Sequence, residues 1–232
     1  EWTDCGLCGA DEADLLFDFN PLKVVKCKSC QLIYINPRYK EEKVSRLYKG
    51  RYFQNPEFFS GLGEYLYGYF DYEESRLNLE KLYSLILDKI EAFRSPGSLL
   101  EVGSAYGYFL SVAKEKGWTV AGIEMSSSAA SYCDQNFSIV PYQGSIYDYE
   151  PQDQIFDCVV LFDVLEHFHD PVKALCFINS ILPEGGIVVV SVPNAARWVL
   201  WFVGRKWEDL QRAKSGEHLF FFNKKTLKKI LI

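Results

Sequence analysis

The chain has 232 residues, of which 48% are apolar and 24% are charged, and its formal net charge at pH 7 is −6. This composition is that of a globular protein, and the length accommodates one large domain with a small appendage. The composition excludes a disordered chain, the acidic balance excludes a general attraction to phosphate backbones, and no apolar run approaches the ~20 residues of a membrane span.

Two Cys-x-x-Cys pairs lie near the start of the chain, Cys5 with Cys8 and Cys27 with Cys30, and eighteen residues separate them. This spacing is typical of a zinc ribbon, in which two turns each supply two thiolates to one tetrahedral ion. Disulfides are the alternative, but they suit a small secreted scaffold better than a cytosolic-looking chain of this kind. A site closed by four thiolates has no open position, so we expect structural zinc rather than catalytic zinc.

Beyond the cysteines, apolar residues recur at helical spacing over 73–92, and Ser95-Pro96-Gly97 ends that helix. Apolar runs then alternate with helical patterns, which predicts an α/β fold with a doubly wound, mainly parallel, Rossmann-like sheet. Ligands of such sheets bind beyond the carboxyl ends of the strands. The expected strands are 98–102, 119–123, around 138–140, 155–162 and 186–192, and the expected helices are 107–116, 127–136 and 171–182.

The segment 99–107, Leu-Leu-Glu-Val-Gly-Ser-Ala-Tyr-Gly, joins the first of these strands to a helix. Gly103 and Gly107 let the backbone approach a ligand closely, and the helix presents unpaired N–H groups at its start. Glu124 ends the next apolar run, where an acid can hold the hydroxyls of a ribose. The Gly-x-x-x-Gly spacing differs from the Gly-x-Gly-x-x-Gly of dinucleotide enzymes, so we expect another nucleotide-type cofactor.

This segment resembles the first motif of the class I S-adenosylmethionine-dependent methyltransferases, acid-x-Gly-x-Gly-x-Gly, with Ala105 in place of the middle glycine. Residues 156–167 are similar to the fourth-strand motif of the same family. The resemblance implies S-adenosylmethionine as the cofactor, with Glu101 at its methionine amino group or a water there. Glu124 is then at the ribose and Met125 on the adenine. The implied cofactor-binding set is Glu101, Gly103, Ser104, Ala105, Gly107, Glu124, Met125, Ser145, Ile146, Phe162 and Asp163.

The ribbon and the connector that follows it resemble the fusion found in bacterial sugar C-methyltransferases, and this resemblance covers the whole chain. We therefore expect a zinc ribbon and connector at 1–53, a helical lid or linker at 54–97, and a methyltransferase domain at 98–232. Family members continue with a sixth strand and an antiparallel seventh after a helix like the one at 226–231. We expect that C-terminal residues, and with them the edge strands of the sheet, are missing from this chain.

Methyl transfer is an in-line displacement from a sulfonium, so the enzyme aligns the acceptor with the methyl carbon and removes a proton from the acceptor. Glu217 and His218 follow the fifth expected strand, and we expect the carboxylate to raise the basicity of the imidazole. The alternative for His218 is a structural histidine that bonds to a backbone carbonyl. His167 is either an acid–base group or a wall of the cofactor pocket. Glu217, His218 and His167 are the predicted catalytic residues.

The sequence thus predicts a cytoplasmic methyltransferase that acts on a small-molecule acceptor, first of all a nucleotide-linked sugar or a glycan precursor. An RNA base methyltransferase guided by the ribbon is the second hypothesis. Only Lys23, Lys26 and Lys28 cluster on the ribbon, so we do not expect a nucleic-acid partner. A protein that binds S-adenosylmethionine without catalysis is the third. No membrane partner is expected, and the acceptor, the methylated atom and the oligomeric state are not defined by the sequence.

Overall fold

The computed structural model describes residues 1–44, 76–196, 204, 207, 210 and 212–232. The end of the expected connector and the first half of the expected lid, at 45–75, lie outside these residues. The chain divides into two units. The first comprises Glu1–Arg46, Asp163–Phe177 and Ser191–Ile232, and the second comprises Leu47–Phe162 and Ile178–Val190.

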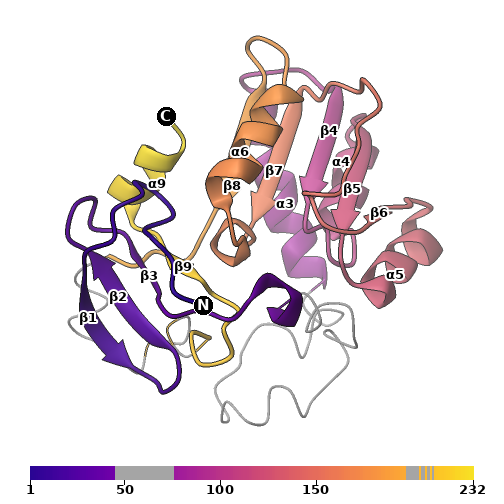
Figure 1. Ribbon diagram of the computed structural model, residues 1–232. Helices are drawn as coiled ribbons and strands as arrows, with labels where there is room; N and C mark the ends of the chain where they lie inside the picture. The colour runs from indigo at the N-terminus through magenta and orange to yellow at the C-terminus, as the bar shows by residue number, and fades with distance from the viewer. Residues whose placement is uncertain (45–75, 197–203, 205–206, 208–209, 211) are drawn as a thin grey trace. The chain divides into compact units, whose positions relative to one another are not determined.

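The second unit contains a five-stranded sheet in the order β6-β5-β4-β7-β8 (Figure 1). β4 pairs in parallel with β5 on one side and with β7 on the other, and β5 pairs in parallel with β6. The strand order therefore reverses next to β4, where open α/β sheets bind their ligands. The predicted Rossmann-like class is confirmed. The strands are β4 (Ser98–Val102), β5 (Thr119–Glu124), β6 (Tyr142–Gln143), β7 (Cys158–Phe162) and β8 (Ile187–Ser191).

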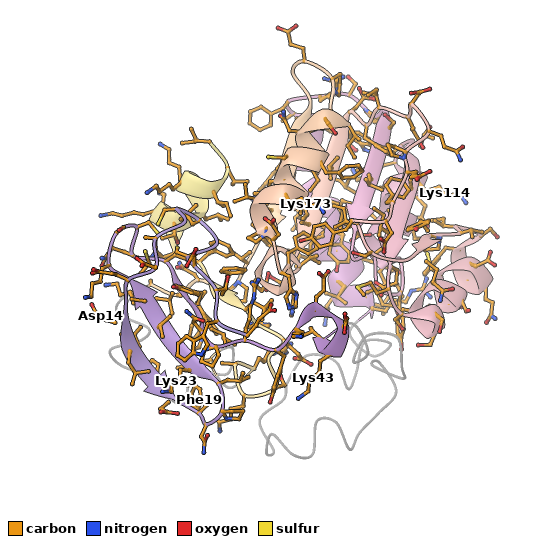
Figure 2. The ribbon with its side chains drawn as sticks, viewed as in Figure 1. Asp14, Phe19, Lys23, Lys43, Lys114 and Lys173 are labelled. Atoms are coloured by element: carbon orange, nitrogen blue, oxygen red, sulfur yellow. The ribbon has the colours of Figure 1, made fainter. Side chains whose placement is uncertain are left out.

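Three helices of the second unit pack their apolar faces on this sheet or on one another, because each carries apolar residues at helical spacing. Leu87, Leu99, Phe109 and Cys158 are completely buried in their common core. Lys114, labelled in Figure 2, donates hydrogen bonds to the backbone carbonyls of residues 137 and 138 and so ties α4 to the end of α5. The helices are α3 (Arg76–Glu91), α4 (Tyr108–Glu115) and α5 (Ser127–Phe137).

The strand that we expected around 138–140 lies further along the chain. Ser138 ends α5 in the left-handed conformation, with φ 51° and ψ 45°, so the chain turns there. Ile139 is buried in the core, which explains the apolar signal at this position. The strand that forms is β6, where Tyr142 and Gln143 pair with the end of β5.

The first unit contains a four-stranded sheet in the order β1-β2-β3-β9. β1 pairs with β2, β2 with β3, and β3 with β9, and all three pairings are antiparallel (Figure 1). β9 comes from the far end of the chain. α6 (Pro171–Ser180) begins in this unit. The other elements of the unit are β1 (Ala13–Asp18), β2 (Lys23–Cys27), β3 (Ile33–Ile35), the 3-10 turn η1 (Leu165–His167), β9 (Phe220–Phe221) and α9 (Lys224–Ile230).

The grouping of residues 191–232 with the ribbon differs from the domain limits that we expected, which placed this segment in the methyltransferase domain. The reason is the pairing of Phe220 and Phe221 with β3, which continues the ribbon sheet. Phe221 is buried in one core with Val24, Ile33, Ile35, Ala195, Leu210 and Ala213. The domain limits themselves stay a prediction.

Among the described residues, the five-stranded sheet has no sixth or seventh strand. In the same part of the chain, no helix has both the length and the apolar character that a membrane span requires.

Candidate functional site

The loop between β4 and α4 lies at the point where the strand order of the five-stranded sheet reverses. The backbone N–H groups of Gly103 and Ser104 donate to the carbonyl of Ile123, at 2.8 and 3.1 Å, which fixes the loop on β5. Gly103, Ala105 and Gly107 have positive φ angles of 74°, 46° and 80°. Ala105 thus adopts the conformation that suits the middle glycine of the resembled motif, at a cost of roughly 1–2 kcal/mol.

Gly107 shows why this loop requires a glycine. A Cβ atom placed on it would lie 2.2 Å from Sγ of Cys133 on α5, far inside van der Waals contact. Gly107 is also the N-cap of α4, and it gives the helix no side-chain cap. The first N–H groups of α4 are therefore not capped by a side chain, as the sequence predicted for a ligand-binding turn.

Two buried polar atoms at this loop have no hydrogen-bond partner among the residues that the structure describes. Glu101 is 4% exposed and Ser104 is 3% exposed. In the described part of the chain, Oε2 of Glu101 and Oγ of Ser104 have no hydrogen-bond partner. Leaving such atoms buried and unbonded costs roughly 1–3 kcal/mol each, and a bound ligand with matching donors would remove this cost.

The electrostatics of the loop favour a positively charged ligand group. Burial raises the pKa of Glu101 well above its ordinary value, and the neighbouring Glu124 raises it further. Burial also raises the pKa of Glu124, although backbone N–H groups oppose this effect. An ammonium or sulfonium group beside these carboxyls would stabilise their ionised forms.

The carboxylate of Glu124 holds two neighbouring segments together. Its Oε2 accepts a hydrogen bond from the N–H of Ala105 at 2.8 Å, and its Oε1 accepts one from the N–H of Ser126 at 2.7 Å. The carboxylate therefore links the loop after β4 to Ser126, the N-cap of α5. Each oxygen of a carboxylate has a second lone pair, so acceptor capacity for ribose hydroxyls remains.

The other residues predicted for the cofactor follow the neighbouring strands. Met125 is partly exposed directly after β5. Ser145 and Ile146 follow β6, where Oγ of Ser145 accepts a hydrogen bond from the N–H of Tyr147 at 3.3 Å and Ile146 is 3% exposed. Phe162 ends β7, and its ring packs edge-on against Phe109, with the centroids 4.9 Å apart. The structure thus brings the predicted set, up to Phe162, to the carboxyl ends of β4, β5, β6 and β7.

Asp163 and the three predicted catalytic residues belong to the first unit. Oδ1 of Asp163 accepts a hydrogen bond from Oγ of Ser191 at 3.2 Å. His167 and His218 meet edge to face, with ring centroids 4.7 Å apart and an interplanar angle of 86°. Nδ1 of His167 lies 2.9 Å from the backbone carbonyl oxygen of Glu217. The structure therefore brings Glu217, His218 and His167 together from η1 and the segment before β9.

The pKa values of this group differ from the expected ones. We expected Glu217 to raise the basicity of His218, but burial lowers the pKa of His218 well below its ordinary value, and His167 and Arg212 lower it further. Burial raises the pKa of Glu217 to about 7, although Arg212 and Ser215 oppose this effect. Burial also lowers the pKa of His167 to about 4. Both imidazoles are therefore neutral at pH 7, and Glu217 is the group that titrates there.

For Glu166 the resemblance implied a place beside His167 at the start of the next helix, but no role. Glu166 is 1% exposed, and one of its carboxylate oxygens lies within 4.8 Å of ring nitrogens of both His167 and His218. The available signal was the acid–histidine dipeptide, which occurs both here and at Glu217-His218. Arg212, which acts electrostatically on Glu217 and His218, is not part of any motif in the sequence.

The four cysteines of the ribbon converge as their spacing predicts. Sγ of Cys5 lies 3.4 Å from Sγ of Cys30, and Sγ of Cys8 lies 3.6 Å from Sγ of Cys27. All four sulfur atoms lie within 4.8 Å of one another, and none is in a disulfide. Zn–S bonds of about 2.3 Å in a tetrahedron require sulfur atoms about 3.8 Å apart. The cluster fits a closed structural zinc site.

Fold and site together define an α/β protein with buried carboxyl groups at the switch point of its sheet and a cluster of four cysteines that fits a zinc ion. A family model described as a methyltransferase domain matches residues 73–231. The chain belongs to this family. The predicted enzyme class, an S-adenosylmethionine-dependent methyltransferase, is confirmed by this match.

Three solved structures are similar to the chain, and the first of them shows the same fold. The chain is similar to the plantazolicin methyltransferase BpumL in complex with SAH, with 16% identity and a TM-score of 0.58 over 82% of this chain and 74% of that chain. It is also similar to DesVI from Streptomyces venezuelae, with 21% identity and a TM-score of 0.47 over 54% of each chain. The sugar N-methyltransferase KedS8 from Streptoalloteichus sp ATCC 53650 has 19% identity and a TM-score of 0.42, over 60% of this chain and 53% of that chain. No curated protein matches the chain.

Proposed function

We propose that the protein transfers the methyl group of S-adenosylmethionine to a small-molecule acceptor, first of all a nucleotide-linked sugar or a glycan precursor. The observation that supports the cofactor part is the pair of buried, unbonded acceptors at the switch point, Oε2 of Glu101 and Oγ of Ser104. The methionine end of S-adenosylmethionine carries an ammonium group, which can donate hydrogen bonds to such acceptors and offset the charge of Glu101.

The remaining cofactor contacts follow from the strand exits. Glu124 holds the ribose hydroxyls with its free lone pairs, Met125 lies on the adenine, and Ser145 with Ile146 flanks its edge. The glycine loop leaves room for the methionine moiety because Gly103 and Gly107 have no side chain. Phe162 and Asp163 line the cofactor after β7. When bound, S-adenosylmethionine supplies a methyl group on a sulfonium that leaves as a neutral thioether.

The acceptor loses a proton when it gains the methyl group, and we assign this step to Glu217 and His218. For a carbon acceptor next to a keto group, the base removes a proton from that carbon, and for an oxygen acceptor it removes the hydroxyl proton. Glu217, with a pKa of about 7, is half ionised at neutral pH and accepts this proton. His218 is neutral and can accept or donate a hydrogen bond at the acceptor, and His167 supports its ring.

The small-molecule acceptor is supported by the resemblance of the ribbon and connector to those of sugar C-methyltransferases. The net charge of −6 gives no support to an RNA substrate. A cytoplasmic location agrees with free cysteines arranged for zinc, and it stays a prediction. The decisive experiment is methyl transfer from isotope-labelled S-adenosylmethionine to a panel of nucleotide-linked keto sugars, with ribosomal RNA fragments in parallel. Labelling of RNA alone would contradict the acceptor class.

The affinity for S-adenosylmethionine is expected to depend on Glu124. We expect Glu124→Gln to weaken binding by about tenfold or more, because the amide replaces charge-assisted hydrogen bonds worth roughly 1.5–3 kcal/mol and turns an N–H group toward a backbone donor. Calorimetric titration measures this change. Glu115→Gln, on the exposed side of α4, is the matched control and should bind as the parent does. Unchanged affinity in Glu124→Gln, or tight binding of NAD by the parent, would contradict the pocket.

Cofactor binding is also expected to release a proton from Glu101. The raised pKa keeps a fraction of this carboxyl protonated in the free protein, and the ammonium of the ligand favours the ionised form. The binding enthalpy should therefore vary with the ionisation enthalpy of the buffer, and Glu101→Gln should abolish this variation. The protonated form of Glu101 is favoured in the folded protein, so its contribution to the free energy of unfolding is present at low pH and is lost as the pH rises through the raised pKa. Glu101→Gln should therefore also reduce the fall in stability with rising pH. A buffer-independent enthalpy in the parent would contradict the assignment.

A further inference from the structure

A second group of metal ligands lies in the first unit, in addition to the four cysteines. Glu166, His167 and His218 place a carboxylate oxygen and two imidazole nitrogens within 4.8 Å of one another. Two imidazoles and one carboxylate are the protein ligands of many catalytic zinc sites and of non-heme iron(II) sites. The N–H of Leu219 donates to the carbonyl of Glu166 at 2.9 Å, which fixes η1 against the segment that carries His218.

The ring of His167 is held by the backbone on both sides of the cluster. Its Nδ1 lies 2.9 Å from the backbone carbonyl oxygen of Glu217. Metal-ligating histidines commonly donate one ring N–H to a backbone carbonyl, which fixes the tautomer and leaves the other nitrogen for the metal. The backbone of Asp163 is a further hydrogen-bond partner of this ring, and an ion would compete with that contact.

His218 supplies an independent observation. Its side chain is 3% exposed, and within the described residues its Nδ1 has no hydrogen-bond partner. A buried imidazole nitrogen with an unused lone pair costs roughly 1–3 kcal/mol, and coordination of a cation would remove this cost.

The surrounding charges also admit a cation. Three carboxyl groups belong to this cluster or adjoin it along the chain, those of Asp163, Glu166 and Glu217. One guanidinium, that of Arg212, acts electrostatically on Asp163, His167, Glu217 and His218. Acidic side chains thus outnumber the basic one, and a divalent ion would favour the ionised form of these buried carboxyls.

We propose that Glu166, His167 and His218 form a binding site for a first-row divalent cation of the zinc type, with an open position for an oxygen of the acceptor. An ion there would polarise a hydroxyl or keto oxygen and lower the pKa of a proton that Glu217 then removes. This inference goes beyond the proposed function, because the ion can bind whether or not the acceptor is a sugar.

The test uses the full-length protein and cobalt(II) or zinc alone as the probe. Metal-free protein, prepared under reducing conditions and refolded by the added metal at the ribbon, should bind two equivalents of cobalt(II). One equivalent should produce the near-ultraviolet thiolate-to-cobalt charge-transfer band of the ribbon. The other should add visible d–d absorption without increasing that band, because its ligands contain no sulfur. Total metal by elemental analysis gives an independent count.

Glu166→Gln should keep the thiolate-bound equivalent and weaken the second by more than about 100-fold, since losing even outer partners of a metal site costs about 10–100-fold. Glu42→Gln, an exposed carboxylate of the same unit, should bind both equivalents as the parent does. Binding of only one equivalent by the parent would overturn the proposal, and so would an unchanged second equivalent in a folded Glu166→Gln variant. The parent's stoichiometry decides the question even if that variant fails to fold. Failure of methyl transfer would leave these readouts unchanged.

Discussion

Glu217→Gln and His218→Ala are each expected to lower turnover by about 10²–10⁴-fold while the affinity for S-adenosylmethionine stays nearly unchanged. The expectation rests on the burial of both side chains beside His167 and on the pKa of about 7 that burial gives Glu217. A general base must be partly ionised at the working pH and must not be held by another strong partner. Steady-state rates with a transferable acceptor and calorimetry with the cofactor measure the two quantities separately.

The role of Glu217 as the base also predicts how kcat/KM changes with pH. Glu217 acts only when ionised, so kcat/KM should rise as the pH rises through about 7. The two histidines are neutral above their lowered pKa values and should add no titration near pH 7. In Glu217→Gln, this rise of kcat/KM with pH should be absent.

His169→Gln is the matched control for the variants of Glu217 and His218. Nε2 of His169 lies 3.1 Å from the backbone carbonyl oxygen of Tyr39, and a glutamine amide can donate in its place. This variant should retain turnover within about threefold and should keep the pH profile of the parent. An effect on folding alone would not change the pH at which kcat/KM rises. A parallel loss of cofactor affinity in Glu217→Gln would instead assign a structural role to that residue.

Removal of zinc is expected to unfold the ribbon and the segments packed with it. Structural zinc contributes about 10–16 kcal/mol of apparent binding energy in small modules, which is more than the stability of most domains. Because β9 and Glu217-His218 belong to the same unit as the four cysteines, loss of zinc should abolish turnover. Binding of S-adenosylmethionine by the second unit should persist.

Chelation followed by circular dichroism, elemental analysis and calorimetry checks this expectation, and Cys27→Ser should reproduce it. Cys176→Ser is the matched control, because Cys176 is a free and exposed cysteine outside the cluster. If the chelated protein kept its turnover and its thermal stability, a structural zinc site would be excluded.

The sequence predicted the parts of the site that depend on neighbours along the chain. The strand at 98–102 was confirmed at its exact bounds as β4, and Tyr108 begins the helix that follows, because apolar runs and glycines are local signals. Glu124 likewise ends its strand as expected. Each cysteine pair forms its own turn, and the two turns together bring four sulfur atoms to one tetrahedral site.

Contacts between residues far apart in the sequence could not be predicted in the same way. No local pattern indicates that Phe220 and Phe221 continue the ribbon sheet, because two apolar residues suit any strand edge. The basicity of His218 was wrong for a related reason. Its sequence neighbour Glu217 suggested a charge partner, whereas burial lowers the pKa of His218 most, and His167 and Arg212 lower it further, which no sequence spacing reveals.

The pairing of β3 with β9 also bears on how this protein is made. β3 emerges early from the ribosome, but its partner strand is synthesised only after nearly the whole methyltransferase sheet. Until then, β3 has an unpaired edge whose N–H and C=O groups are open to other chains. A nascent chain that stalls before Phe220 therefore displays a ribbon with an open edge, and such chains are candidates for aggregation or for capture by chaperones.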